Sequence, residues 1–78
     1  MNVKENDAYD WIDKGVAFSK LGKHSEAIEC FDKTLKLKPD YTDVWNIKGL
    51  TLHNLKKHSK AIECYNKAIE LDSGNKMK

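Results

Sequence analysis

Small and apolar residues recur at three- and four-residue steps along most of the chain, which is the spacing of one face of an α-helix. Two such runs occupy the first half: Ala8, Trp11, Gly15, Phe18 and Leu21, and then Ala27, Ile28, Phe31 and Leu35. Two more occupy the second half: Trp45, Gly49 and Leu52, and then Ala61, Ile62, Tyr65, Ala68 and Ile69. The pattern requires no strand, so we expect an all-α protein with four helices.

Residues that break helices separate these runs. Gly22 is placed to end the first helix in a left-handed conformation, and Pro39 prevents the second helix from continuing. Thr42 offers a side-chain oxygen to cap the third helix. Lys56 stands where the first half has Gly22, and without a stop signal there the third and fourth helices could fuse and swap between chains.

The two halves of the chain are copies of one unit. A shift of 34 positions superimposes Trp11 on Trp45, Gly15 on Gly49, and the segment Ala27-Ile28-Glu29-Cys30 on Ala61-Ile62-Glu63-Cys64. A fixed period of this length is the signature of a stacked repeat architecture.

The two mid-helix glycines indicate where the helices of each unit approach each other closely. Each costs about 1 kcal/mol relative to alanine, a cost that a close helix contact would explain. We expect Ala27 and Ala61 opposite these glycines, with an aromatic residue, Phe31 or Tyr65, packed between the helices.

These residues resemble the tetratricopeptide repeat. The first copy carries the pattern at Trp11, Gly15, Phe18, Ala27, Phe31 and Pro39; the second carries it at Trp45, Gly49, Leu52, Ala61, Tyr65 and Ala68, and has Ser73 in place of the proline. The resemblance implies two helical hairpins in a short right-handed α-solenoid. We expect repeats at residues 8–41 and 42–75, an N-terminal tail at 1–7 and a C-terminal tail at 76–78.

In this family, peptides usually lie along the concave face, against the first helix of each repeat. The resemblance places this groove at Tyr9, Ile12, Asp13, Val16, Ser19, Lys20, Asp43, Asn46, Ile47, Leu50, His53 and Asn54. Its centre is apolar and suits the apolar face of a helix or an extended peptide. The alternative is that Ile12 and Val16 are partly buried by the neighbouring repeat. The carboxylate clamp of chaperone cofactors is absent, because aliphatic residues replace its Lys and Asn.

Self-association is the second expectation. Arrays of this kind generally contain three or more repeats and a closing helix, and this sequence shows two repeats without one. The last helix would then expose Ile62, Tyr65 and Ile69 and invite a homodimer or a higher assembly.

Composition excludes several other functions. The net charge is only +2 and acids and bases are interspersed, which disfavours nucleic acid and membranes as partners. All 14 basic residues are lysine, and we expect no secretory leader and no membrane-spanning segment. Cys30 and Cys64 lack the close spacing of metal ligands with each other or with histidine, so we read them as small apolar fillers and expect no metal, no cofactor and no catalysis.

The sequence therefore predicts a cytoplasmic protein-interaction module, a scaffold or adaptor that binds a protein or peptide partner in its groove and self-associates. The alternative is a purely structural self-assembling unit, or a piece of a longer natural or engineered array, with no ligand of its own.

Overall fold

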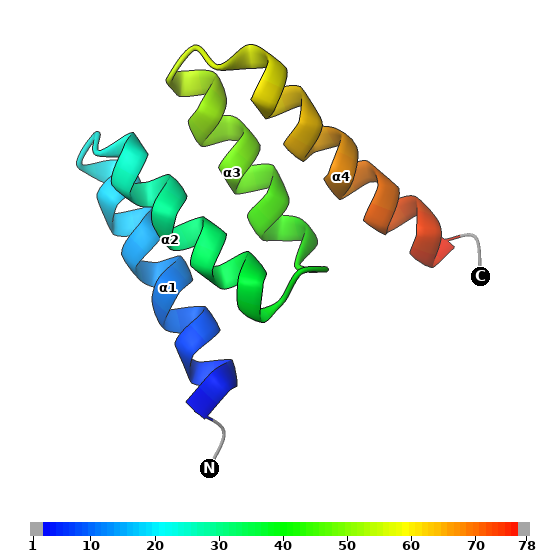
Figure 1. The fold of residues 1–78 in the computed structure, drawn as a ribbon, viewed down its shortest axis with the longest axis horizontal. Helices are drawn as coiled ribbons and strands as arrows, with labels where there is room; N and C mark the ends of the chain where they lie inside the picture. The colour runs from blue at the N-terminus through cyan, green and yellow to red at the C-terminus, as the bar shows by residue number, and fades with distance from the viewer. Residues whose placement is uncertain (1–2, 77–78) are drawn as a thin grey trace.

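The computed structural model describes residues 3–76, and it describes side chains for residues 7–73. The described chain forms four helices and no strand: α1 (Val3–Lys20), α2 (His24–Leu37), α3 (Thr42–Asn54) and α4 (His58–Lys76) (Figure 1). The all-α prediction is confirmed. α1 begins ahead of Ala8, where the sequence places the start of the first repeat.

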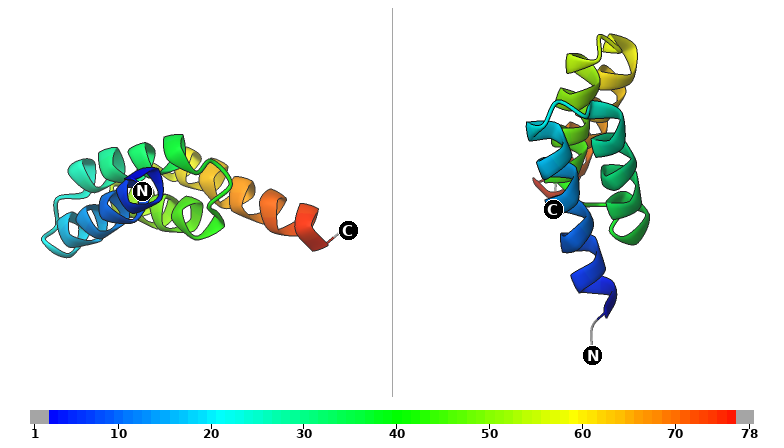
Figure 2. Two further views of the ribbon diagram at one scale, coloured as in Figure 1. Left: turned by 90° about the horizontal axis from the view of Figure 1, so that it is seen from below. Right: turned by 90° about the vertical axis from the view of Figure 1, so that its left-hand side faces the viewer.

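The helices form two antiparallel hairpins that stack side by side. α1 and α3 lie in one layer and α2 and α4 in the other, which two views at right angles show (Figure 2). α2 packs against both α1 and α3, whereas α4 packs chiefly against α3. α2 is therefore the helix through which the two repeats are joined, and α4 lies at the outer edge of the array.

The core of the first hairpin is built on Phe31, which is fully buried. A Cβ atom on Gly15 would lie 2.5 Å from Cε1 of the Phe31 ring, so only glycine admits the ring at this distance. The close approach predicted at Gly15 is thus confirmed. Its nearest neighbour, however, is the Phe31 ring and not Ala27, because the flat ring enters the space that a side chain at Gly15 would fill.

The second hairpin repeats this contact with Tyr65. A Cβ atom on Gly49 would lie 2.7 Å from Cε1 of the Tyr65 ring and 3.2 Å from the backbone oxygen of Ala61. Here the predicted proximity of Ala61 is also seen. The 34-residue period therefore reproduces a packing contact between the two helices of each hairpin.

Each hairpin turn contains one residue in the left-handed conformation, at equivalent positions of the two repeats. Gly22 has φ of 80° and Lys56 has φ of 65°. The amide of the following residue, Lys23 or Lys57, donates a hydrogen bond to the carbonyl oxygen five residues back, at 2.8 and 2.9 Å. Lys56 thus ends α3 as Gly22 ends α1. The idea of a fused third and fourth helix is wrong, because Lys56 accepts the left-handed conformation.

The start of α3 differs from the prediction. Thr42 is the first helical residue, and Tyr41 precedes the helix without any side-chain capping bond. The Tyr41 carbonyl oxygen accepts hydrogen bonds from the amides of Val44 and Trp45 at 3.1 and 3.3 Å. Trp45 also donates from its indole nitrogen to the Pro39 oxygen at 2.9 Å. These bonds fix the loop between the hairpins without the predicted threonine cap.

We predict that Lys56→Gly stabilises the protein by about 1 kcal/mol, because a non-glycine residue in the left-handed region costs roughly 1–2 kcal/mol. Thermal unfolding monitored by circular dichroism should show a midpoint about 4–8 °C higher. Lys57→Gly is the control, since it changes the neighbouring residue without relieving the positive φ. A midpoint unchanged in Lys56→Gly would contradict the assignment of strain to this residue.

Candidate functional site

The predicted groove residues lie along α1 and α3. The aliphatic residues at the centre of the groove differ in how far they are buried. Ile12, Val16 and Ile47 are half-buried and pack against a core cluster formed by Ala27, Phe31, Leu35 and Val44. Leu50, in contrast, is 55% exposed. The aliphatic residues therefore serve the core in part, as the alternative interpretation held, and Leu50 is the one with most surface free for a partner.

The polar members of the groove are exposed. They are Asp13, Lys20, Asp43, Asn46, His53 and Asn54, while Ser19 is half-buried. The ring of His53 contacts the ring of His58, the first residue of α4, at a centroid distance of 4.9 Å. The structure thus distributes the polar residues along the length of α1 and α3 and does not gather them into one site.

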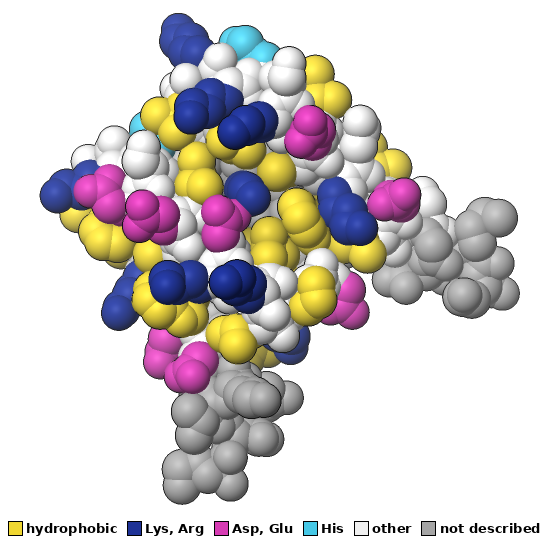
Figure 3. All heavy atoms as spheres, in the orientation of Figure 1, with side chains coloured by type: hydrophobic (Ala, Val, Ile, Leu, Met, Phe, Trp, Pro, Cys, Tyr) yellow, Lys and Arg dark blue, Asp and Glu magenta, His cyan; other side chains and the backbone are white. Residues whose placement is uncertain are grey.

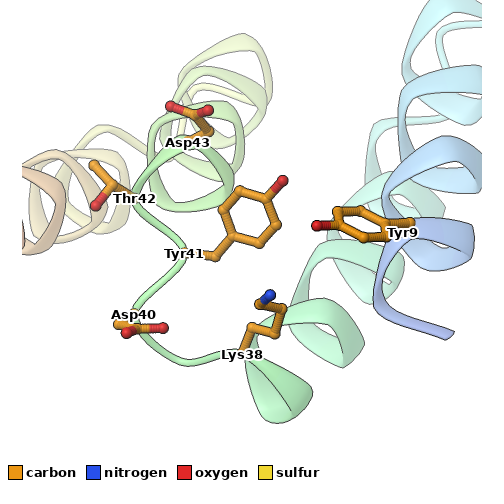
Figure 4. A pocket seen from close by; sticks show the side chains of 6 residues that line it. All are labelled: Tyr9, Lys38, Asp40, Tyr41, Thr42 and Asp43. Carbon is orange, nitrogen blue, oxygen red and sulfur yellow. The ribbon is translucent and has the colours of Figure 1, made fainter. Parts of the chain in front are cut away.

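One end of this face holds a pocket that sequence reasoning missed. It has a volume of about 490 Å³ and is lined by Tyr9, Lys38, Asp40, Tyr41, Thr42 and Asp43 (Figure 4). Of these residues, only Tyr9 and Asp43 were predicted for the groove. Tyr41 falls outside the helical periodicity, and the pairing of α1 with the loop after α2 is a tertiary contact, so no sequence signal marked the pocket.

The outer face of α4 matches a face that α2 buries. Leu35 is 8% exposed on α2, whereas its counterpart Ile69 on α4 is 61% exposed. Ile28 of α2 packs against the cluster of Leu52, Ala61 and Cys64, while its counterpart Ile62 is 56% exposed. Tyr65 is half-buried: its ring faces Gly49, but no helix of the described chain covers the side that corresponds to the α3-facing side of Phe31.

The outer face of α1 differs from the equivalent face of α3. On α3, Val44 packs against α2 and is 1% exposed. The residues of α1 that correspond to Val44 and Ile47 are Asp10 and Asp13, both exposed. The two ends of the stack are thus chemically unlike, with an apolar α4 and carboxylates on α1.

Next to these carboxylates is an apolar hollow between α1 and α2. Its volume is about 490 Å³, and its apolar lining comes from Trp11, Ala17, Phe18, Leu21 and Cys30. The corresponding hollow of the second repeat contains Trp45 and Cys64 but not Leu52, which is 5% exposed. In the second repeat, Ile28 of α2 packs against Leu52 and Cys64 and covers part of this hollow. In the first repeat, the equivalent part of the hollow stays open.

Both cysteines are buried free thiols, with 4% and 5% of their surface exposed. Burial raises the pKa of each thiol; the ammonium of Lys14 beside Cys30, and that of Lys48 beside Cys64, oppose this effect. A thiol with a raised pKa is a poor nucleophile and metal ligand. Within the described residues no group of three His, Cys, Asp or Glu side chains is arranged to hold a metal ion.

The charges on the surface are mixed. Lys48 and Asp32 form a 2.6 Å ion pair between α3 and α2, partly open to solvent, so it is worth at most about 1 kcal/mol. Figure 3 shows basic and acidic side chains interspersed with hydrophobic patches across one face. No helix among the described residues is long and apolar enough to cross a membrane.

Comparison with known proteins agrees with this architecture. The family model described as tetratricopeptide repeat matches residues 8–41 and 42–75. A TPR repeat-containing protein of Methanocaldococcus jannaschii is 34% identical over 41 residues, which are 53% of this chain and 12% of that protein. The crystal structure of MamA has a TM-score of 0.86 at 24% identity, covering 91% of this chain and 42% of that one. A second MamA structure has a TM-score of 0.81 at 26% identity, covering 85% and 36%.

The chain therefore belongs to the tetratricopeptide-repeat family, a family of helical scaffolds that in general bind other proteins and are not enzymes. It spans less than half the length of the MamA chains and a small part of the archaeal relative.

We predict that the stability of the protein falls as the pH rises above about 8.5, the ordinary thiol pKa. Folding raises both thiol pKa values, so above this pH the unfolded chain binds fewer protons than the folded chain and is favoured. The contribution of the thiols is complete below pH 8.5 and is lost as the pH passes through their raised values. Urea unfolding at neutral and alkaline pH measures this loss, and the double variant Cys30→Ala, Cys64→Ala should lose less; an equal loss would contradict the prediction.

Proposed function

We propose that this protein is a non-catalytic interaction module of the cytoplasm that binds a helix or an extended peptide across α1 and α3. The observation that carries the proposal is the 55% exposure of Leu50 on α3, together with the half-buried Ile12 and Val16 on α1 and Ile47 on α3. A helix with an apolar stripe would cover such a row of residues. The two buried free thiols are compatible with a reducing compartment.

The binding energy would come mainly from covering the exposed part of this surface. Burying a leucine side chain fully contributes about 1.5–3 kcal/mol, and Leu50 offers about half of that. The half-buried aliphatics add less, because they are already packed against the core. The polar residues around them would orient a partner more than they would hold it.

We predict that Leu50→Asp weakens capture of a protein partner at least about tenfold, because a carboxylate would be desolvated in the contact. Partners are identified by pull-down with the unaltered protein, and affinities are then measured by calorimetry. Leu21→Asp is the matched control, since Leu21 is 71% exposed at the turn after α1. Circular dichroism should show unchanged helicity in both variants. Equal affinity of Leu50→Asp and the unaltered protein would refute the groove.

Self-association through α4 is the second proposed function. It is supported by the correspondence between α2 and α4: Ile62, Tyr65 and Ile69 occupy the positions at which α2 is covered by α3. A second copy of the chain would cover the same positions of α4. This surface is distinct from the row of residues on α1 and α3, so the two functions are compatible.

The chemistry of α1 favours pairing of two α4 helices over head-to-tail stacking. Stacking α1 of one copy on α4 of another would put Asp10 where Val44 is buried, and the carboxylate would lose its water. Pairing of α4 with α4 brings apolar residues together from both copies. Such an arrangement has twofold symmetry and closes as a dimer.

We predict that the protein dimerises with rising concentration and that Ile69→Glu makes it monomeric. The glutamate introduced in each copy would face the apolar surface of α4 in the other copy. Multi-angle light scattering across a concentration series measures the mass. Leu21→Glu discriminates between the two arrangements: it leaves a dimer of α4 helices intact but disrupts head-to-tail stacking, in which the hollow beside Leu21 would be filled. A monomer at every concentration of the unaltered protein would refute self-association.

A further inference from the structure

The pocket formed by Tyr9, Lys38, Asp40, Tyr41, Thr42 and Asp43 has the composition of a site for a positively charged group. Tyr9 comes from α1 and Tyr41 from the loop before α3, and their rings meet edge to face, with centroids 6.5 Å apart and planes at 88°. Figure 4 shows the Tyr9 hydroxyl pointing toward the Tyr41 side chain, with the amino group of Lys38 beside the two rings. The faces of aromatic rings attract cations.

The protein places one of its own cations in this pocket. The Lys38 nitrogen lies 5.7 Å from the centroid of the Tyr9 ring and 5.6 Å from that of Tyr41. Lys38 forms no ion pair with any described carboxylate. The ammonium is therefore held by the rings alone, an interaction worth about two- to fivefold in an equilibrium constant at an exposed site. An incoming cation can displace it at small cost.

Two carboxylates determine which sign of charge the pocket favours in a ligand. Asp40 and Asp43 line the pocket on either side of Tyr41 and are exposed. They offset the single charge of Lys38, so an anion would meet net repulsion once it entered. A cation at the rings would also be attracted by these two carboxylates, and Lys38 forms an ion pair with neither of them.

We propose that this pocket binds an arginine side chain of a partner peptide, in exchange for Lys38. A guanidinium group is planar, stacks on aromatic rings and can pair with a carboxylate through two hydrogen bonds, whereas an ammonium group presents a single point of charge. None of the 78 residues of the chain is arginine, so none of them can take this role.

The position of the pocket connects it to the proposed groove, and the peptide source of the arginine rests on that function. Tyr9 is on α1 and Asp43 is in the first turn of α3, the same two helices that carry Ile12 and Ile47. A peptide that lies across these aliphatic residues can reach the pocket with one side chain. The ligand would then be a peptide with an arginine next to an apolar stripe.

The test uses small probes that need only the pocket: the blocked amides of arginine, of lysine and of citrulline, the last being an uncharged analogue of arginine. Nuclear magnetic resonance follows the ring signals of Tyr9 and Tyr41 and the signal of the Lys38 methylene next to its nitrogen. We expect saturable shifts with arginine, weaker ones with lysine and none with citrulline. Equal shifts with citrulline, or no saturation with arginine, would overturn the proposal; equal affinity for lysine and arginine would overturn the choice of arginine.

Three variants sharpen the result. Lys38→Met removes the competing cation and should tighten arginine binding about two- to fivefold. Asp43→Asn and Tyr9→Leu should weaken it, while Glu26→Gln, a change of charge at the start of α2 and outside this pocket, should not. Weaker binding by Lys38→Met would overturn the exchange. Because the probes do not cover Leu50, failure of the groove and failure of this pocket give separate outcomes.

Discussion

The insertion of an aromatic ring against a glycine is the contact on which the rest of the structure depends. Phe31 meets Gly15 on α1 and shares its cluster with Val44 of α3, so one buried side chain joins three helices. Tyr65 makes the same contact with Gly49. The ring fixes how closely α2 lies to α1, and this distance in turn fixes where α3 can pack. The stacking angle of the two repeats follows from it, and so does the face shared by α1 and α3.

The same repeat that builds the fold also creates its unfilled surfaces. A hairpin hides its apolar face only against the next hairpin, so identical sequence positions are buried in one copy and exposed in the other. Ile69 is exposed because, within residues 3–76, the helix that covers Leu35 has no counterpart beside α4. On α1, by contrast, Asp10 replaces the buried Val44. The positions at which the two repeats differ, such as Asp10 and Val44, therefore determine which ends of the stack can pair.

The proposed binding surfaces differ in the kind of chemistry they offer. Leu50 and the half-buried aliphatic residues of α1 and α3 provide apolar area, the outer face of α4 provides the exposed Ile62 and Ile69, and the tyrosine pocket provides attraction for a cation. The α4 face is separate from the other two surfaces, which share α1 and α3. A scaffold with separate surfaces can hold a peptide while a second copy occupies α4, and neither event requires a change in the core.

The sequence by itself determined the four helices, the 34-residue period, the close approach at the two glycines and the exposure of Ile62 and Ile69 on α4, because helical spacing and repeated residues record these directly. It placed Ala27 opposite Gly15, whereas the Phe31 ring is the nearest neighbour there; residue spacing does not show how an aromatic ring fills the space between two helices. It also predicted no helix stop at Lys56, because spacing does not show that a non-glycine residue adopts the left-handed conformation there. Only the tertiary structure decided that Ile12 and Val16 are half-buried and that Tyr41 meets Tyr9. These two tyrosines are far apart in the chain, and it is the packing of α1 against α2 that brings them together.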